Sequence, residues 1–182
     1  MYQSVKIFNI PTNCWIRAAI VAIAAKHVRD FEEHWQPALE SMKEEDKYWD
    51  WAFKKRLSLQ DDNFEGYALE CEDMTQGLIM LETQWHHSQI DGKESDRLVY
   101  VENLASAPWN RIAREPIIYR GTGRALLRFA RQRSLDLGYG GRVGLHSLSN
   151  AVKFYERCNM PGYGADPDKE YLDYFEYGEI EG

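Results

Sequence analysis

The sequence predicts an α/β protein with a mixed sheet: an N-terminal strand and helices, an antiparallel meander, then a parallel βαβα crossover and a final strand. Two patterns support this prediction. The hydrophobic period changes from helical to strand-like after residue 63, and a glycine-rich turn at residues 121–123 then leads into a helix. A chain of 182 residues with 44% hydrophobic residues can bury one substantial core. We therefore expect a single domain over residues 1–182.

The first expected elements are a strand at residues 4–10, stopped by Pro11, and a helix that Thr12 or Asn13 would cap. The following apolar run, residues 14–25, is too short to span a bilayer and contains Arg17. Its larger apolar residues recur at helical spacing: Ile16, Ile20 and Ile23. We interpret the run as the apolar face of an amphipathic helix and not as an export signal.

Two further helical regions follow. Residues 30–43 are dominated by charge, and Pro37 should divide them into two short helices. Residues 46–59 carry an aromatic set that is either core or the wall of a substrate pocket. The turn cluster at residues 60–63 closes this helical part.

Three strands of a meander are expected at residues 64–72, 77–87 and 97–104. Two of them contain a carboxylate within an apolar stretch, Glu82 and Glu102. A carboxylate is costly to bury without a partner or a role. Each is therefore either a strand position open to solvent or a functional group.

The C-terminal part should contain the crossover. Pro108 ends the preceding strand, a helix runs from the glycine turn to Gly138, and a strand at residues 142–147 leads to a helix at residues 149–157 capped by Ser149. Such a crossover is right-handed and has a ligand-binding notch. The aromatic tail at residues 171–177 would add a strand within the chain or pair with a second copy in a homodimer; the sequence leaves both open.

The glycine turn has the features of an anion site. Gly121 and Gly123 allow the backbone to approach a ligand, and a helix N-terminus offers unpaired N–H groups. Arg120 and Arg124 flank the turn, so a phosphate would meet backbone donors and guanidinium groups together. An ordinary loop that enters a helix has the same pattern. The neighbouring sequence must therefore distinguish an anion site from such a loop.

Charge and cysteine usage limit the partners. The net charge of −7 and the pI near 5.3 argue against a nucleic-acid partner and for a cationic small molecule or a basic peptide. The three cysteines lack paired spacing, which favours free thiols in a reducing, cytoplasmic compartment. Because the apolar run at residues 14–25 is too short to span a bilayer, we expect no membrane partner. The histidines, among them His86 and His146, do not have metal-ligand spacing, so we expect no metal.

The order of motifs in the C-terminal half resembles a known family. A strand precedes R-G-x-G-x-A-L-L, and a second strand precedes N-A-x-x-F-Y-E. This order is similar to that of the GNAT superfamily of acetyl-CoA-dependent N-acyltransferases, strongly from residue 97 to 160 and by element order before that. Two features depart from its pattern: Ile118 stands where Gln or Arg is usual, and residues 109–116 form an insertion.

The resemblance implies roles for particular residues. The donor, acetyl-CoA, would place its pyrophosphate on the backbone of the loop, namely Arg120, Gly121, Thr122, Gly123, Arg124 and Ala125. Its pantetheine arm would follow Leu104, Ala105 and Ser106, with Asn150 and Phe154 on the other side. Tyr155 matches the general acid that protonates the leaving thiolate, and Glu102 matches the general base, with Glu82 as its reserve.

The function implied is an acetyl-CoA-dependent N-acetyltransferase. The acetyl group would move from the thioester directly to a primary amine of a small molecule or peptide, without a covalent enzyme intermediate. The alternative is a non-catalytic module on the same fold that senses CoA or binds a protein partner. The sequence does not indicate the acceptor, because specificity in such folds resides in loops and in the helical N-terminal part.

Overall fold

The computed structural model describes residues 2–111 and 116–180. They form two compact units: unit 1 comprises residues 2–80, 103–111 and 116–126, and unit 2 comprises residues 81–102 and 127–180. The unit boundaries fall inside strands β4 (Met74–Glu82) and β5 (Val99–Ser106) and inside helix α4 (Thr122–Asp136). These three elements therefore contribute residues to both units. The single domain over the whole chain stays a prediction.

Unit 1 contains the N-terminal strands. Neighbouring strands follow the order β6-β1-β2-β3-β4-β5, with β1 at Tyr2–Asn9, β2 at Cys14–Ala22, β3 at Phe64–Cys71 and β6 at Tyr119–Arg120. Strand β1 pairs antiparallel with both β2 and β6. Glu72 and Asp73 join β3 to β4 with positive φ angles of 51° and 61°, the conformation of a two-residue hairpin turn. The strands predicted at residues 4–10 and 64–72 are confirmed.

The helix predicted over residues 14–25 is wrong, because Cys14–Ala22 is strand β2. Residue Asn13 has a positive φ of 52°, and the Asn9 side chain accepts a hydrogen bond from the Thr12 amide at 3.0 Å. These residues therefore close a hairpin and do not cap a helix. Alternate residues Ala18 and Ile20 are buried, and β2 gains backbone partners in β1 and β3. Sheet pairing outweighs the helical spacing of the isoleucines.

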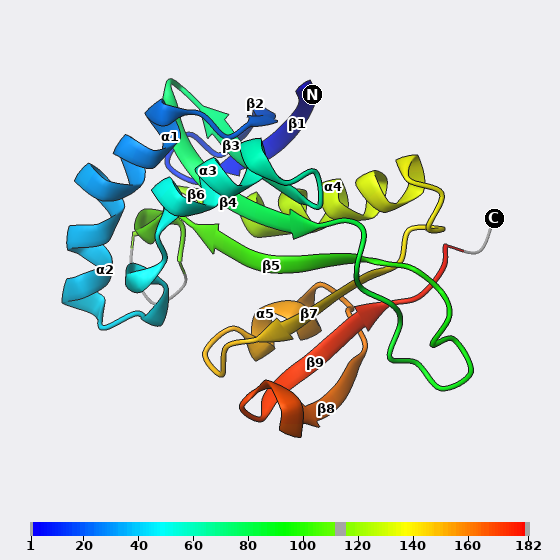
Figure 1. Cartoon of the computed structure of the whole chain (residues 1–182). Coiled ribbons are helices and arrows are strands. Elements are labelled where there is room, and N and C mark those ends of the chain that lie inside the picture. The colour runs from blue at the N-terminus through cyan, green and yellow to red at the C-terminus, as the bar shows by residue number, and fades with distance from the viewer. Residues whose placement is uncertain (1, 112–115, 181–182) are drawn as a thin grey trace. The chain divides into compact units, whose positions relative to one another are not determined.

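The helical part of unit 1 contains five segments. They are α1 (Ala25–Asp30), a π-helical turn (Phe31–Trp35), α2 (Gln36–Met42), a 3-10 turn (Glu45–Tyr48) and α3 (Trp51–Gln60). Figure 1 shows α2 continuing the line of α1. Pro37 lies in the first turn of α2, directly after the wide π-helical turn in which the Gln36 amide bonds to the Phe31 carbonyl. Within residues 30–43 it therefore begins a segment and does not break one.

The core of unit 1 lies between these helices and the sheet. Trp35, Leu39 and Trp51 are essentially inaccessible and pack with strand residues such as Leu78 and Ala105. Part of the aromatic set predicted at residues 46–59 is therefore core. Tyr48 and Phe53 are exposed, which excludes them from that core.

Unit 2 contains the crossover. Its strands follow the order β4-β5-β7-β9-β8, with β7 at Val143–Ser147, β8 at Gly162–Asp166 and β9 at Leu172–Tyr177. Strands β5 and β7 are parallel, as predicted, and β9 is antiparallel to both β7 and β8. Figure 1 shows β7, β9 and β8 side by side. The tail strand thus pairs within the chain, while β8 was missed by the sequence reasoning.

The helices after the glycine turn agree in part with expectation. Helix α4 ends near Gly138, whose φ of 79° is typical of a helix C-terminus. Helix α5 spans Val152–Arg157, and its N-cap is Ala151 without a side-chain hydrogen bond. The prediction of Ser149 as cap is wrong, because Ser149 and Asn150 lie in a turn before the helix. Short 3-10 turns occur at Pro108–Asn110 and Pro167–Lys169.

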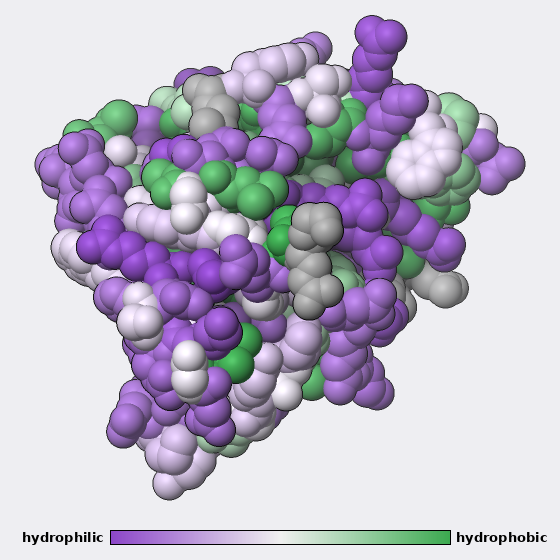
Figure 2. Space-filling model, turned by 90° about the vertical axis from the view of Figure 1, so that its right-hand side faces the viewer, coloured by the Kyte–Doolittle hydropathy of each residue, from purple (hydrophilic) through white to green (hydrophobic). Residues whose placement is uncertain are grey.

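The surface view in Figure 2 shows a face on which hydrophilic residues predominate and hydrophobic ones gather only in small groups. In residues 2–111 and 116–180, no helix is long and apolar enough to cross a membrane.

Candidate functional site

The glycine loop of unit 1 is built by the end of β6 and the start of α4. Gly121 is exposed and has a φ of 96°, which a residue with a side chain rarely adopts. A side chain added there would meet no atom within 4 Å, so the space beside the loop is open. The Ala125 amide donates to the Gly121 carbonyl at 2.8 Å, and α4 therefore begins directly at Thr122. The first amides of α4 face outward from such a helix start.

Several contacts fix this loop in place. The Tyr119 hydroxyl donates to Glu72 at 2.7 Å, and the Tyr119 amide donates to the Asn110 side chain at 3.0 Å. Burial and the neighbouring Glu72 carboxylate raise the pKa of Tyr119, so its hydroxyl keeps its proton. At Gly77 of β4, a side chain would come within 2.7 Å of Thr122 and 2.8 Å of Leu126. The absence of a side chain there lets α4 lie directly on the strand.

The start of α4 has the open position that best fits an anion. Gly121 leaves space beside the loop, and the first backbone N–H groups of a helix have no partner within it. An anion there would meet these N–H groups and the positive end of the helix. The Thr122 hydroxyl has no hydrogen-bond partner among the described residues, but it is buried, and the Thr122 methyl group packs toward Gly77 of β4. The fit to a phosphate therefore rests on the backbone of the loop.

The predicted pantetheine strand lies at the end of β5 in unit 1. Leu104 and Ser106 are half-buried, and Ala105 is buried. The Ser106 carbonyl already accepts two bonds from Arg111, from Nε at 3.0 Å and from Nη2 at 2.9 Å. Sequence reasoning missed Asn103, which is buried and whose side-chain oxygen has no partner within the described residues.

The insertion at residues 109–116 is described only in part, because residues 112–115 lie outside the described residues. Trp109 donates its ring N–H to the Gln76 side chain at 2.9 Å, and its ring meets that of Trp35 edge to face at 6.3 Å. Arg111 pairs with Asp46 and with Glu44. The start of the insertion thus connects β5 to the helical part of unit 1.

Tyr155 and its neighbours belong to unit 2. Tyr155 is 6% exposed on α5, with its ring 5.0 Å from that of Phe154 and 5.5 Å from that of Phe175. Burial raises the pKa of Tyr155, so the phenol is protonated at neutral pH, as a proton donor must be. Phe154 is half-buried and Asn150 is exposed in the turn before α5.

The two candidate bases, also in unit 2, differ in surroundings. Glu102 is exposed on β5, whereas Glu82 at the end of β4 is 8% exposed. The Glu82 carboxylate lies 3.2 Å from Nε2 of His86. Glu102 thus occupies a strand position open to solvent, which was one of the two possibilities for each carboxylate. Glu82 is buried and has the polar partner that a buried carboxylate requires.

A chain of hydrogen bonds in unit 2 was missed by the sequence reasoning. The Tyr100 hydroxyl lies 2.9 Å from Nδ1 of His146, and Nε2 of His146 lies 2.9 Å from Asp166. His86 stacks on the Tyr100 ring with centroids 4.1 Å apart. The sequence showed Tyr100 only as one of the even-numbered residues on one face of an apolar strand, and His86 and His146 only as isolated histidines. These patterns gave no reason to connect Tyr100, His146 and Asp166.

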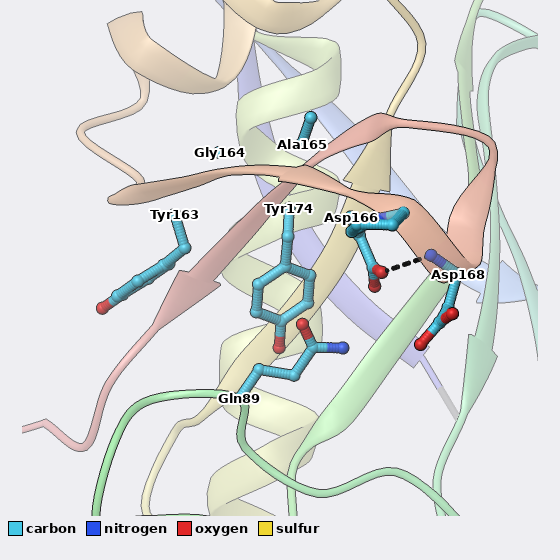
Figure 3. Close-up of a pocket in the computed structure, with 8 residues that line it drawn as sticks. Gln89, Tyr163, Gly164, Ala165, Asp166, Asp168 and Tyr174 are labelled. Carbon is cyan, nitrogen blue, oxygen red and sulfur yellow. Dashed lines mark hydrogen bonds between the residues drawn. The ribbon is translucent and has the colours of Figure 1, made fainter.

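An open groove of about 350 Å³ lies beside this chain in unit 2. Figure 3 shows Asp166 and Asp168 at one end, Tyr163 at the other, and Tyr174 and Gln89 between them. Asp166 therefore joins the hydrogen-bond chain to an open surface. No group of three or more possible metal ligands is found in the described part of the chain.

Comparison with known proteins identifies the fold. No protein-family model and no curated protein matches the sequence. Solved structures do match at the level of the backbone. The GNAT domain of S. lividans PAT has a TM-score of 0.64 at 11% identity, covering 98% of this chain and 97% of that one. The chain has the GNAT fold.

Two further structures of N-acetyltransferases were solved with coenzyme A. PaiA from Thermoplasma acidophilum gives a TM-score of 0.60 at 12% identity, covering 91% of this chain and all of that one (100%). YlbP from Bacillus subtilis gives 0.56 at 14% identity, covering 96% of each chain. The GNAT fold expected from the motifs at residues 120–127 and 150–156 is thus confirmed, including the N-terminal part that matched by element order alone.

Proposed function

We propose that this chain is an acetyl-CoA-dependent N-acetyltransferase that transfers the acetyl group directly to a primary amine of a small molecule or peptide. The observation that carries the proposal is the loop at residues 120–125, where an open glycine with a positive φ leads directly into the start of a helix. The GNAT fold and its CoA-bound examples support coenzyme A as the source of the anion.

In this proposal each unit supplies a different part of the chemistry. The loop of unit 1 holds the pyrophosphate, and Leu104, Ala105 and Ser106 lie along the pantetheine arm. The Ser106 carbonyl already accepts two hydrogen bonds from Arg111, so we expect the arm to contact other backbone groups of this strand end. Asn150 and Phe154 belong to unit 2, and the resemblance of the motifs to the GNAT superfamily is the support for their role toward the arm.

In this proposal, residues of unit 2 act as the general acid and the general base. Tyr155 donates to the leaving thiolate, and its protonated state at neutral pH supports this role. We keep Glu102 as a candidate base acting through water, and we favour Glu82, because its burial and its contact with His86 resemble those of a working acid–base group. The acidic net charge of −7 supports a cationic acceptor.

The first test is binding of the donor, measured as the rise in melting temperature with acetyl-CoA. Gly121→Ala should abolish most of that rise, because a Cβ at a φ of 96° distorts the loop. Gly138→Ala is the matched control: it also has a positive φ, 79°, and open space, but it lies at the other end of α4. Equal loss of the acetyl-CoA shift in both variants would contradict the assignment of the loop.

The second test is turnover with a panel of amines, followed as release of free CoA thiol. Tyr155→Phe should lower turnover by about 100-fold while leaving the acetyl-CoA shift in place. Glu82→Gln and Glu102→Gln, measured side by side, distinguish the two bases. If acetyl-CoA binds but thiol release never exceeds the amine-free background, the non-catalytic CoA-sensing or protein-interaction module is the correct alternative.

A further inference from the structure

One face of unit 2 carries a continuous polar chain across three strands. Tyr100 lies on β5, His146 on β7 and Asp166 at the end of β8. The parallel register places Tyr100 opposite Gly144, two residues before His146, and His146 lies opposite Tyr174 of β9. The missing side chain at Gly144 leaves space here, since a Cβ there would come within 2.6 Å of the Tyr174 hydroxyl.

The partners determine the direction of the hydrogen bonds. Asp166 accepts a bond from its Asp168 backbone neighbour at 2.9 Å, and this bond together with His146 lowers the pKa of Asp166. As an ionised carboxylate it can only accept, so Nε2 of His146 must carry the proton. Burial lowers the pKa of His146, although the bond to Asp166 opposes that effect, so the ring is neutral and Nδ1 accepts. The Tyr100 hydroxyl is therefore the donor to Nδ1.

The chain is buried at one end and open at the other. Tyr100 is 7% exposed and the His146 side chain 4%, whereas the Asp166 side chain is 17% exposed at the groove of Figure 3. Within the described residues, His146 is the hydrogen-bond partner of the Tyr100 hydroxyl, whose lone pairs remain able to accept a proton.

Other titratable groups face this chain from every neighbouring element. Tyr100 meets the charges of Glu82 from β4 and Glu102 from its own strand, and His86 stacks on its ring. His146 meets the Tyr174 ring from β9, with centroids 4.9 Å apart, and feels the charge of Lys169. Glu176, also on β9, is bonded to Tyr174 and Ser88 and does not contact the chain directly. The carboxylates around Tyr100 favour the arrival of a positive charge there.

We propose that Tyr100, His146 and Asp166 form a proton-exit path that carries the proton of the acceptor amine to the open groove. This inference rests on the proposed function. As the amine attacks the thioester, its proton binds the Tyr100 oxygen while the Tyr100 proton moves to Nδ1 of His146. The Nε2 proton of His146 moves to Asp166, which releases it to water. One proton leaves the ammonium group and one enters solvent, so the transfer balances without a further reactant. It leaves the His146 proton on Nδ1, and a half-turn of the imidazole ring is needed to face an N–H toward Asp166 again before the next cycle.

In this path Tyr100 is the group that meets the acceptor, and His146 and Asp166 act through it. In this path Tyr100 takes the proton in place of the carboxylate bases of the proposed function, Glu82 and Glu102, whose charges then act on Tyr100. It predicts that the acceptor amine lies on the β5 face that carries Tyr100. It also explains why a histidine with a lowered pKa is bonded to an aspartate that reaches an open surface.

The first experiment tests the hydrogen bonds of Tyr100, His146 and Asp166 without a measurement of activity. Nitrogen NMR of histidine in the full-length protein at pH 7 should show His146 as the neutral tautomer with the proton on Nε2. Asp166→Asn should change that tautomer or its chemical shift, while Asp168→Asn, the matched loss of a neighbouring carboxylate, should leave it unchanged. A proton on Nδ1 in the wild-type protein would overturn the path.

The second experiment measures turnover with the best amine of the panel. Asp166→Asn should lower kcat by about tenfold or more with KM for acetyl-CoA unchanged, and Asp168→Asn should stay within about twofold. In His146→Gly, added imidazoles should restore activity, and the restored rate should depend on the pKa of each imidazole. Rescue that is independent of the pKa of the imidazole, or a rate of Asp166→Asn equal to that of the wild type, overturns the proton-exit path and leaves the proposed function standing. Absence of turnover in the wild-type protein overturns the proposed function and the path with it.

Discussion

Arg111 and Asp46 form a two-point ion pair within unit 1. Nη1 of Arg111 lies 3.0 Å from Oδ1 of Asp46, and Nη2 contacts Oδ2. Asp46 is 5% exposed, and the same guanidinium also binds the Ser106 carbonyl. One side chain of the insertion therefore ties the 3-10 turn before α3 to the end of β5.

Removal of this arginine should be costly. Arg111→Ala leaves the Asp46 carboxylate buried without its partner, so we expect a loss of about 3–5 kcal/mol in the free energy of unfolding. Glu44→Gln is the control, because Glu44 lies farther away, 3.4 Å from Nη1, and its removal keeps the two-point pair. Its cost should be about 1 kcal/mol or less. Urea unfolding of both variants measures the difference, and equal losses would contradict the role of Asp46.

Gly77 should be intolerant of a side chain. Gly77→Ala places a Cβ 2.7 Å from the Thr122 methyl group and 2.8 Å from a Leu126 methyl group, so α4 must shift away from β4. Overpacking of this kind costs about 1–3 kcal/mol. We also expect a smaller acetyl-CoA shift in melting temperature, because the start of α4 moves. Gly178→Ala, where a Cβ meets nothing within 4 Å, should change neither quantity.

The cysteines should differ in reactivity. Cys14 is exposed, whereas Cys71 is 5% exposed. Burial and the neighbouring Glu72 charge raise the pKa of Cys71, which keeps it as the unreactive thiol. A chromogenic disulfide reagent at pH 8 should modify Cys14 rapidly and Cys71 only in denaturant. Cys14→Ser should remove the fast phase, whereas Cys71→Ala and Cys158→Ala should both keep it. Rapid labelling of Cys71 in the folded protein would show that unit 1 opens there.

His146 should make stability depend on pH. Its pKa in the folded protein is lowered by burial, so the unfolded chain binds more protons than the folded one below the ordinary histidine pKa of about 6.5. The contribution of the neutral ring is present above that value and is lost as the pH falls through the lowered pKa. His146→Gln should therefore narrow the difference in melting temperature between pH 7.5 and pH 5. An unchanged difference would show that His146 does not titrate in this way.

Much of the C-terminal half follows from local sequence. Glycines fix the start and end of α4, because Gly121 and Gly138 both need a positive φ. The apolar strands β5 and β7 then have one connection, a helical crossover, which makes them parallel. Strand β8 was missed because it contains Gly162 and Gly164, is exposed, and is ordered by pairing with β9.

The N-terminal half shows where local reasoning fails. Isoleucines at positions 16, 20 and 23 fit helical spacing, yet the even positions 16, 18 and 20 also form one face of a strand. Pairing with β1 and β3 makes this segment a strand and not a helix. Strand β1 lies across a turn and β3 is distant in the sequence, so local spacing does not reveal either partner. The proton path was not visible for the same reason, since Tyr100, His146 and Asp166 meet only through sheet register.

The π-helical turn at Phe31–Trp35 bears on how this chain could change in length. Its wide turn, in which the Gln36 amide bonds to the Phe31 carbonyl, holds one residue more than an α-helical turn would. Loss of one exposed residue, Glu32 or Glu33, would narrow the turn to an α-helical one and leave Pro37 inside a regular helix, where its ring clashes with the carbonyl four residues earlier. The length of the helical run between β2 and β3 is thus tied to the proline that follows the turn.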